Sequence, residues 1–220
     1  LYRIRLDHAD DAGRAIAVRH VPEELRIEEA GVSVDALRYL DADHLARCQK
    51  MHHDFDNHWR PGDRPAVAHQ RRELHDLLRG VSALVIAGGH VVSLLNRLRL
   101  FDVLRHATHI PIIAWSAGAM VLTDRVVIYH DFPPYGKDIA QVLDCGLGLC
   151  PGLVLLVDAK HRLRLDGNAH DIGRFALRVR PARAVTLDAG ERIDFTAGRV
   201  TSMTTRRLSV AGGLEPSVTA

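Results

Sequence analysis

Ile110-Pro111-Ile112-Ile113-Ala114-Trp115-Ser116-Ala117-Gly118-Ala119-Met120 is the stretch that decides the fold expected for this chain. The apolar run around Pro111 is typical of a short buried strand, and the small residues after Ser116 are typical of the start of a helix. A serine on such a sharp turn presents its hydroxyl to the positive end of the next helix. The order Ala-x-Ser-x-Gly therefore indicates a nucleophile elbow with alanine in place of the first glycine. A junction formed only for close packing would give the same pattern.

The segment before this stretch has the same order of elements. Residues 81–87 form an apolar run typical of a buried strand, Gly88 and Gly89 break it, and residues 90–106 have the apolar spacing of a helix. Two successive strand–turn–helix units predict a parallel sheet with right-handed crossovers. Because ligands of such sheets bind at the carboxyl ends of the strands, the glycine pair and Ser116 are expected to face one another.

The rest of the chain divides into a helical first part and a later part with several strands. Helical spacing covers residues 1–20, 33–59, 66–79 and 169–179, and strands are expected at 126–129, 153–157, 184–187, 192–195 and 199–203. The length fits one domain over residues 1–207, with a mainly helical part (1–80) and a motif-bearing core (81–205). Residues 208–220 are expected to form a flexible tail.

The composition argues against several classes of protein. The net charge is +2, from 29 basic and 27 acidic residues mixed along the chain, which argues against nucleic acid as a partner. No apolar run approaches the roughly 18–20 residues needed to cross a bilayer, so no membrane partner is expected. The three cysteines lack C-x-x-C spacing, which argues against a disulfide scaffold or a zinc site and fits a reducing cytoplasm. We expect a cytoplasmic protein that uses no metal and no cofactor.

Four short motifs follow one another at suitable intervals in the later part of the chain. They are Ala87-Gly88-Gly89, Trp115-Ser116-Ala117-Gly118-Ala119, His130-Asp131-Phe132-Pro133, and Gly146-Leu147-Gly148-Leu149 with Pro151. In this order they resemble the serine peptidases of the dipeptidase E and cyanophycinase family, over about residues 81–203. The resemblance implies an α/β fold like that of class I glutamine amidotransferases: a flavodoxin-like three-layer sandwich with a mostly parallel, doubly wound sheet, here with an N-terminal helical segment.

Carried over residue by residue, the resemblance makes Ser116 the nucleophile of a serine-type peptidase. The backbone N–H groups of Gly89 and Ala117 become the oxyanion hole, where small residues let the backbone approach the developing charge. Asp131 matches the acidic member of the triad. The implied reaction is proteolysis: hydrolysis of an amide bond in a small peptide-like substrate through an acyl-enzyme. The residues expected to support these groups are Gly88, Trp115 and Gly118.

The chain departs from the family where the triad histidine is expected, at the end of the strand over residues 153–157. Val157 or Asp158 occupies that place. A serine hydroxyl is a poor nucleophile until a base takes its proton, and histidine is the usual base because it titrates near neutrality. Three histidines are candidates for this role: His161, His130 and His90. We rank His161 highest.

Two other hypotheses stay open. The missing triad histidine favours a catalytically impaired family member that keeps its pocket for binding or regulation. The Ala-x-Ser-x-Gly pattern also fits an α/β-hydrolase esterase, whose late histidine would have to be His170, the last histidine of the chain. The helical first part offers a surface for a homodimer.

Overall fold

The structure is a computed structural model that describes residues 1–129, 139–163 and 169–217. Residues 1–80 form the three helices that the apolar spacing predicts. α1 (Tyr2–Ala17) and α2 (Glu23–Trp59) make a hairpin, and α3 (Pro65–Arg79) follows a short 3₁₀ turn, η1 (Pro61–Asp63). The prediction that Ser33 starts the second helix is wrong: Ser33 is buried within α2, where its hydroxyl accepts a hydrogen bond from Arg174.

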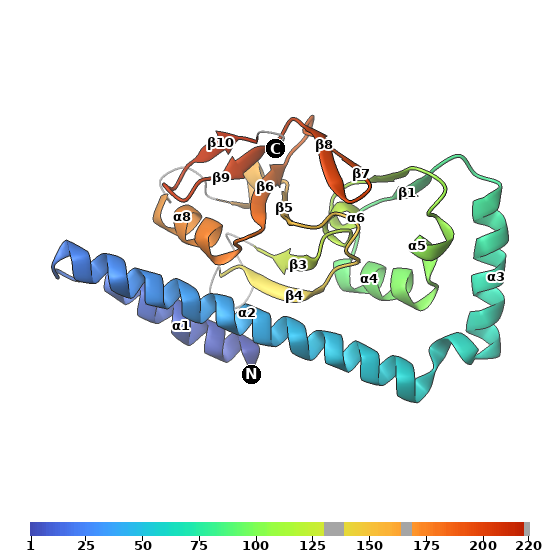
Figure 1. Cartoon of the computed structure of the whole chain (residues 1–220), viewed down its shortest axis with the longest axis horizontal. Coiled ribbons are helices and arrows are strands. Elements are labelled where there is room, and N and C mark those ends of the chain that lie inside the picture. The colour runs from blue at the N-terminus through green and yellow to red at the C-terminus, as the bar shows by residue number, and fades with distance from the viewer. Residues whose placement is uncertain (130–138, 164–168, 218–220) are drawn as a thin grey trace.

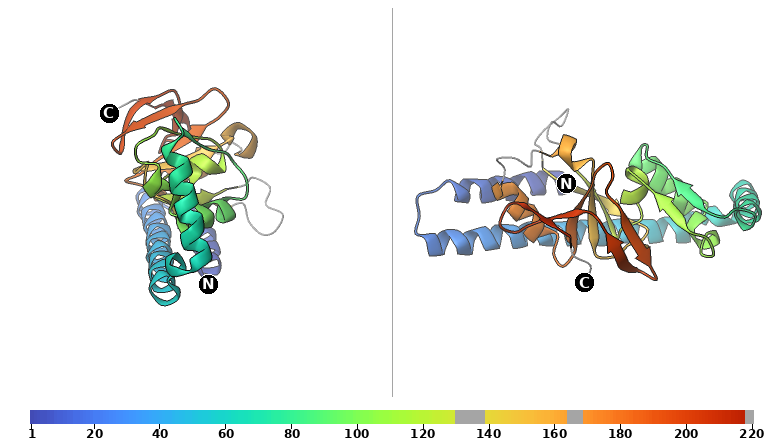
Figure 2. Two further views of the ribbon diagram at one scale, coloured as in Figure 1. Left: turned by 90° about the vertical axis from the view of Figure 1, so that its right-hand side faces the viewer. Right: turned by 90° about the horizontal axis from the view of Figure 1, so that it is seen from above.

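The helices of the first part set the shape of the molecule. α2 runs along the length of the molecule on one side of the β elements, and α3 stands across one end (Figure 1). In the end-on view the α1–α2 hairpin lies on the side opposite β9 and β10 (Figure 2). Among the described helices, α2 included, none combines the length and the apolar character needed to cross a membrane.

The strands of the described residues form four separate small sheets. β1 (Leu84–Ile86) pairs in parallel with β2 (Ile112–Ala114), β3 (Arg125–Ile128) pairs antiparallel with β4 (Gln141–Cys145), and β7 (Ile193–Thr196) pairs antiparallel with β8 (Arg199–Met203). The fourth sheet has the order β10-β9-β6-β5. In it, β5 (Leu153–Val157) and β6 (Arg183–Leu187) are parallel, whereas β9 (Arg206–Leu208) and β10 (Leu214–Pro216) are antiparallel to their neighbours.

The predicted three-layer sandwich around one mostly parallel, doubly wound sheet is therefore wrong. The parallel pairs β1–β2 and β5–β6 are present, but within the described ranges they belong to different sheets. β3 forms its ladder with β4, an antiparallel strand in a segment where the sequence predicts no strand. Apolar spacing and turn residues are local signals, whereas the joining of strands depends on contacts far apart in sequence.

Short helices connect these strands: α4 (Val91–Leu100), α5 (Val103–His106), α6 (Ala117–Met120), α7 (Ala159–Arg162) and α8 (Ala169–Arg178). The single helix predicted over residues 90–106 is interrupted at Asp102, which has a left-handed φ of 52°. Strand β10 lies in the segment from residue 208 that was predicted to be a flexible tail, and it pairs with β9.

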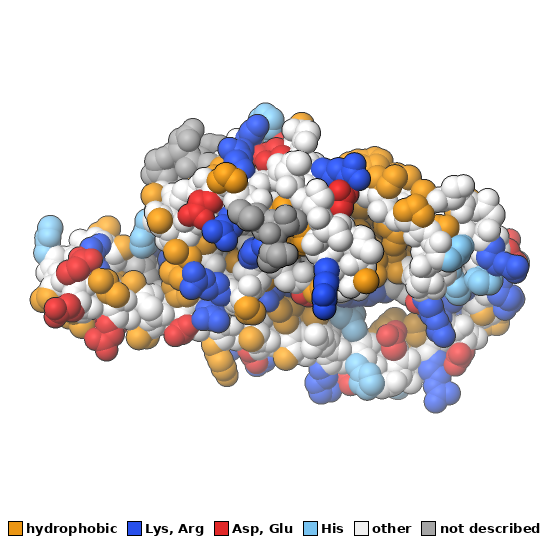
Figure 3. All heavy atoms as spheres, turned by 45° about the horizontal axis from the view of Figure 1, so that its top comes forward, with side chains coloured by type: hydrophobic (Ala, Val, Ile, Leu, Met, Phe, Trp, Pro, Cys, Tyr) orange, Lys and Arg blue, Asp and Glu red, His pale blue; other side chains and the backbone are white. Residues whose placement is uncertain are grey.

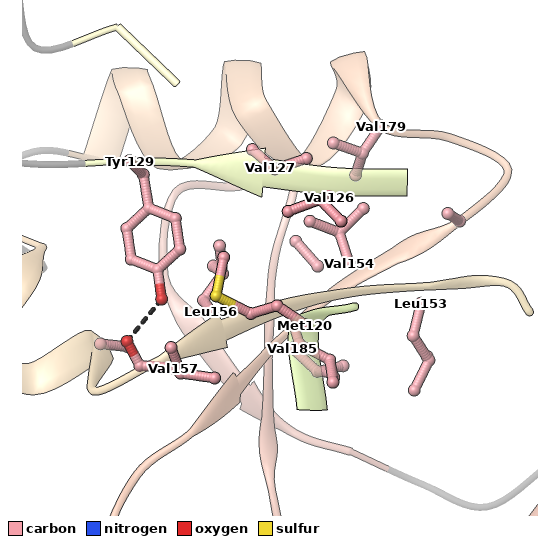
Figure 4. Close-up of a cluster of buried hydrophobic side chains, with 14 of the residues drawn as sticks. Met120, Val126, Val127, Tyr129, Leu153, Val154, Leu156, Val157, Val179 and Val185 are labelled. Carbon is pink, nitrogen blue, oxygen red and sulfur yellow. Dashed lines mark hydrogen bonds between the residues drawn. The ribbon is translucent and has the colours of Figure 1, made fainter. Parts of the chain in front are cut away.

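The main core surrounds β5. All five β5 side chains are buried, and they share one apolar cluster with Met120 of α6 and with residues of β3, β6 and α8. The Tyr129 hydroxyl, at the end of β3, donates a hydrogen bond to the carbonyl of Val157 (Figure 4). Because α6 packs against β5, the turn that carries Ser116 is attached to the best-buried strand of the protein.

Buried charges attach the α1–α2 hairpin to this core. Arg174 of α8 forms an ion pair with Asp10 of α1, and Arg178 of α8 forms one with Asp41 of α2. All four side chains are less than 10% exposed. Gly13 leaves the room for this contact, because a Cβ there would overlap the Arg174 guanidinium.

Candidate functional site

Ser116 lies on the sharp strand-to-helix turn that the sequence predicts. β2 ends at Ala114, α6 begins at Ala117, and Ser116 has φ 54° and ψ −133°. Residues with a Cβ rarely adopt this conformation, which costs on the order of 1–3 kcal/mol. The Ser116 side chain is exposed, whereas Ala117 is buried. A strained backbone that presents a hydroxyl to solvent is the geometry of a nucleophile elbow.

Two glycines allow this turn to lie close to the end of β1. Because β1 and β2 are parallel neighbours, with Ile86 opposite Ala114, the loops that follow them are adjacent. A Cβ on Gly88 would lie 2.8 Å from both the Cβ and the Oγ of Ser116, and one on Gly118 would overlap the carbonyl oxygen of Ile86. The structure therefore places Gly88, the first glycine of the pair, against Ser116.

Two backbone N–H groups are predicted to form the oxyanion hole. In the described ranges, neither the N–H of Ala117, at the start of α6, nor the N–H of Gly89 donates a hydrogen bond to protein. The position of a Gly88 Cβ would be 3.7 Å from the Ala117 nitrogen, so this donor lies beside the Gly88 loop. Gly89 has a φ of 140°, which a residue with a side chain rarely adopts. Unpaired N–H groups at the first turn of a helix favour a developing negative charge.

His90 and His161, the predicted bases that the structure describes, are hydrogen-bonded elsewhere. Among the described residues, no histidine forms a hydrogen bond with its hydroxyl. His90 instead caps α4, and its Nδ1 lies 3.3 Å from the backbone nitrogen of Ser93. His161 pairs with Asp158: His161 Nδ1 is 2.6 Å from Asp158 Oδ1. His170 is exposed at the start of α8.

The environment of His161 favours its charged form. The hydrogen bond to Asp158 is the largest cause that raises the pKa of His161, the negative charges of Asp158 and Asp188 add to it, and the charge of Lys160 opposes it. The histidine side chain is 81% exposed, so solvent reaches the ring freely. An imidazole held by a carboxylate in this way is a candidate proton acceptor.

Asp188 is a carboxylate in a segment, Asp188-Ala189-Gly190-Glu191, whose sequence is typical of a hairpin turn. It directly follows β6, and its side chain is 4% exposed. Its Oδ1 accepts a hydrogen bond from the Lys160 backbone nitrogen, and its Oδ2 has no hydrogen-bond partner in the part of the chain that the structure describes. Its position in the sequence could have identified Asp188. It directly follows one strand, as Asp158 directly follows the parallel strand β5.

The remaining predicted residues divide into two groups. Trp115, next to the elbow, is 50% exposed, and apolar side chains gather on the surface near β1 and α6 (Figure 3). His130 and Asp131 lie outside the described residues, so their predicted roles stay predictions.

Within the described ranges, no three His, Cys, Asp or Glu side chains are grouped so that they could hold a metal ion.

Comparisons of the sequence do not identify a family. No model of a known protein family matches the chain, and no curated protein matches it either. The resemblance to the dipeptidase E and cyanophycinase family therefore rests on the four sequence motifs alone, and it stays a prediction.

Proposed function

We propose that the chain is a serine-type hydrolase that cleaves an amide bond in a small peptide-like substrate through an acyl-enzyme on Ser116. The observation that carries the proposal is the strained backbone of Ser116, with φ 54° and ψ −133°, at an exposed strand–helix turn. Strain of this kind persists only where the surrounding structure holds it, and it concentrates at functional sites. Gly88 and Gly118 provide the close packing that holds it here.

The proposed reaction follows from the groups around the hydroxyl. Ser116 Oγ attacks the carbonyl carbon of the amide, and its proton passes to a base. The negative charge that forms on the carbonyl oxygen is stabilised by the N–H groups of Gly89 and Ala117. The amine leaves with a proton, and water then hydrolyses the ester on Ser116. His161 is the base that we favour, because a carboxylate already orients its ring.

A second function is favoured by one specific observation. Among the described residues, no histidine is hydrogen-bonded to Ser116, and a serine without a base loses several orders of magnitude of rate. In this alternative the chain is a catalytically impaired relative that binds a small peptide-like ligand at the same turn, with a regulatory role.

A fluorophosphonate probe separates the two functions, because it reacts covalently with an activated serine. The first function predicts labelling of the wild-type protein, loss of labelling in Ser116→Ala, and no effect of Ser202→Ala, a control at an exposed serine on β8. The second function predicts no labelling of Ser116 from pH 6 to pH 9, together with saturable binding of peptides.

We also propose a cytoplasmic setting and a homodimer. The cytoplasmic setting is supported by the three cysteines, which are all free thiols. The homodimer is supported by the apolar side chains that the hairpin exposes, among them Ile27 and Val32 of α2. The mass of the protein in solution, measured by light scattering, tests the homodimer.

A further inference from the structure

Asp158 and Asp188 lie side by side at the carboxyl ends of β5 and β6, two neighbouring strands of the four-stranded sheet. β5 and β6 are parallel, Val157 lies opposite Leu187, and the two aspartates are the next residues of their strands. The Asp158 backbone nitrogen donates a hydrogen bond of 3.2 Å to the Leu187 carbonyl, which extends the ladder to this point. The sheet therefore places two carboxylates at the turn that begins α7.

Asp158 fixes the orientation of the His161 ring. An ionised carboxylate can only accept hydrogen bonds, so the 2.6 Å contact requires a proton on His161 Nδ1. This leaves Nε2 of the neutral ring with a lone pair to accept a proton. Asp158 has φ 57° and ψ 41°, a left-handed conformation that is uncommon for residues other than glycine, asparagine and aspartate. The backbone at Asp158 is thus bent at the residue that holds the histidine.

Asp188 holds the turn on which His161 lies. Its Oδ1 accepts the 3.1 Å hydrogen bond from the Lys160 backbone nitrogen, one residue before the histidine. Its Oδ2 is buried without a hydrogen-bond partner in the described ranges, and Arg206 Nη2 lies 3.7 Å away. A buried, incompletely satisfied carboxylate is unfavourable for stability, so a role in the site would explain its presence. Its charge also acts on His161, together with that of Asp158 and against that of Lys160.

We propose that Asp158 and Asp188 are positioning residues that hold His161 as the proton acceptor for Ser116, so that Asp158 takes the role that the family resemblance gives to Asp131. This inference rests on the proposed function. α6, which follows Ser116, packs against β5, which precedes Asp158, so the two turns belong to one packed unit. The proposal requires His161 Nε2 to come within hydrogen-bond distance of Ser116 Oγ when a substrate lies against the elbow.

The proton transfers balance without any other reactant. His161 Nε2 takes the proton of Ser116 Oγ as the bond to the carbonyl carbon forms, and it gives that proton to the amine as the carbon–nitrogen bond breaks. Asp158 keeps its negative charge throughout and stabilises the imidazolium that forms between the two steps. Asp188 transfers no proton.

The test combines two measurements on Asp158→Asn, Asp188→Asn and a control variant, Asp54→Asn, at an exposed ion pair on α2. Asparagine tolerates the left-handed backbone of Asp158, so this variant is expected to fold, and far-UV circular dichroism checks that it does. The first measurement is the pKa of His161 from its imidazole NMR signals. The second is the rate at which a fluorophosphonate labels Ser116, as a function of pH.

We expect Asp158→Asn to lower the pKa of His161 and to slow labelling at neutral pH by about 10²–10⁴-fold. Asp188→Asn should lower the pKa of His161 in the same direction, and Asp54→Asn should change neither quantity. In the wild type, labelling should rise with pH through the pKa of His161, because the base must be neutral to accept a proton.

Two results would overturn the inference. A His161 pKa that is the same in Asp158→Asn as in the wild type would show that the pair does not form. Labelling that is slowed by Asp131→Asn and not by Asp158→Asn would assign the acidic role to Asp131. Either result leaves the proposed function intact, provided that Ser116 is labelled. No labelling of Ser116 in the wild type would instead overturn the proposed function, and with it the role of His161 as acceptor, while the NMR titration still reports the pairing.

Discussion

The buried ion pair between Asp41 of α2 and Arg178 of α8 predicts that Asp41→Ala strongly destabilises the protein. The two side chains are 4% and 6% exposed, and Arg178 donates two hydrogen bonds of 2.7 Å to the carboxylate of Asp41. In the variant the guanidinium keeps the Ala140 carbonyl and the Tyr2 hydroxyl as acceptors, at 2.8 and 3.3 Å. It loses its counter-charge, and a buried charge without a partner is costly.

The size of the destabilisation in Asp41→Ala follows from the burial of this ion pair. Removing one member of a buried ion pair costs about 3–5 kcal/mol of the free energy of unfolding. With a urea m-value of about 2 kcal/mol/M, the midpoint of urea unfolding should fall by about 2 M, which far-UV circular dichroism measures. A double variant, Asp41→Leu with Arg178→Met, removes both charges and should recover most of the loss.

An exposed pair on the same helix provides the control. Asp35 is 75% exposed and lies 3.4 Å from Arg38, so Asp35→Ala should cost about 0.2–1 kcal/mol. If Asp41→Ala costs no more than Asp35→Ala, the reasoning that buried charge holds the hairpin on the core is refuted.

Two further predictions concern the elbow and the pH dependence of stability. Gly88→Ala places a Cβ 2.8 Å from Ser116 Oγ, so we expect fluorophosphonate labelling of Ser116 to slow by at least about 10-fold; an unchanged rate in a folded variant would contradict the close approach. Burial alone would raise the pKa of Asp144, but hydrogen bonding to His52 and the charge of Arg99 outweigh it, and the pKa is lowered from its ordinary value of 3.8. A lowered carboxyl pKa adds stability above the ordinary value, and this stability is lost as pH falls through the lowered pKa. Between pH 5 and pH 3 the wild type should therefore lose more free energy of unfolding than Asp144→Asn, and equal losses in urea titrations would count against this ion pair.

The sequence predicts the elbow well because its signals are local. The apolar run before Ser116 and the small residues after it, Gly118 included, reflect requirements within a few residues of the turn, and Gly88 and Gly89 directly follow the earlier apolar run. The parallel pairing of β1 with β2 brings Gly88 against Ser116, and the order of the two strand–turn–helix units predicts this pairing.

The arrangement of the sheets could not be predicted in the same way. β4 has a charged residue, Asp144, within a short apolar segment, so its spacing does not distinguish a strand from a loop. Which strands join is decided by distant contacts, such as the antiparallel ladder between β3 and β4. The sequence motifs lie at the ends of the strands, so they do not indicate which strands pair with one another.

Charged residues in buried positions are the other signal that sequence reasoning missed. Arg174 and Arg178 lie one helical turn apart on α8, as arginines on a solvated face would, yet both are buried against acidic partners on α1 and α2. Asp188 has the sequence context of a hairpin turn, and its burial depends on the Lys160 backbone and on β9. A partner on a distant element decides whether such a charge is buried.

The central claim, that Ser116 is an activated nucleophile, is tested most directly by locating the modified residue after treatment with a fluorophosphonate. The tryptic peptide of residues 106–125 contains Ser116 as its single serine, so mass spectrometry can assign the adduct without ambiguity. We predict one adduct on this peptide in the wild type, with a yield that rises with pH, and none in Ser116→Ala. An unmodified peptide at every pH from 6 to 9, in protein shown to be folded, would contradict the claim.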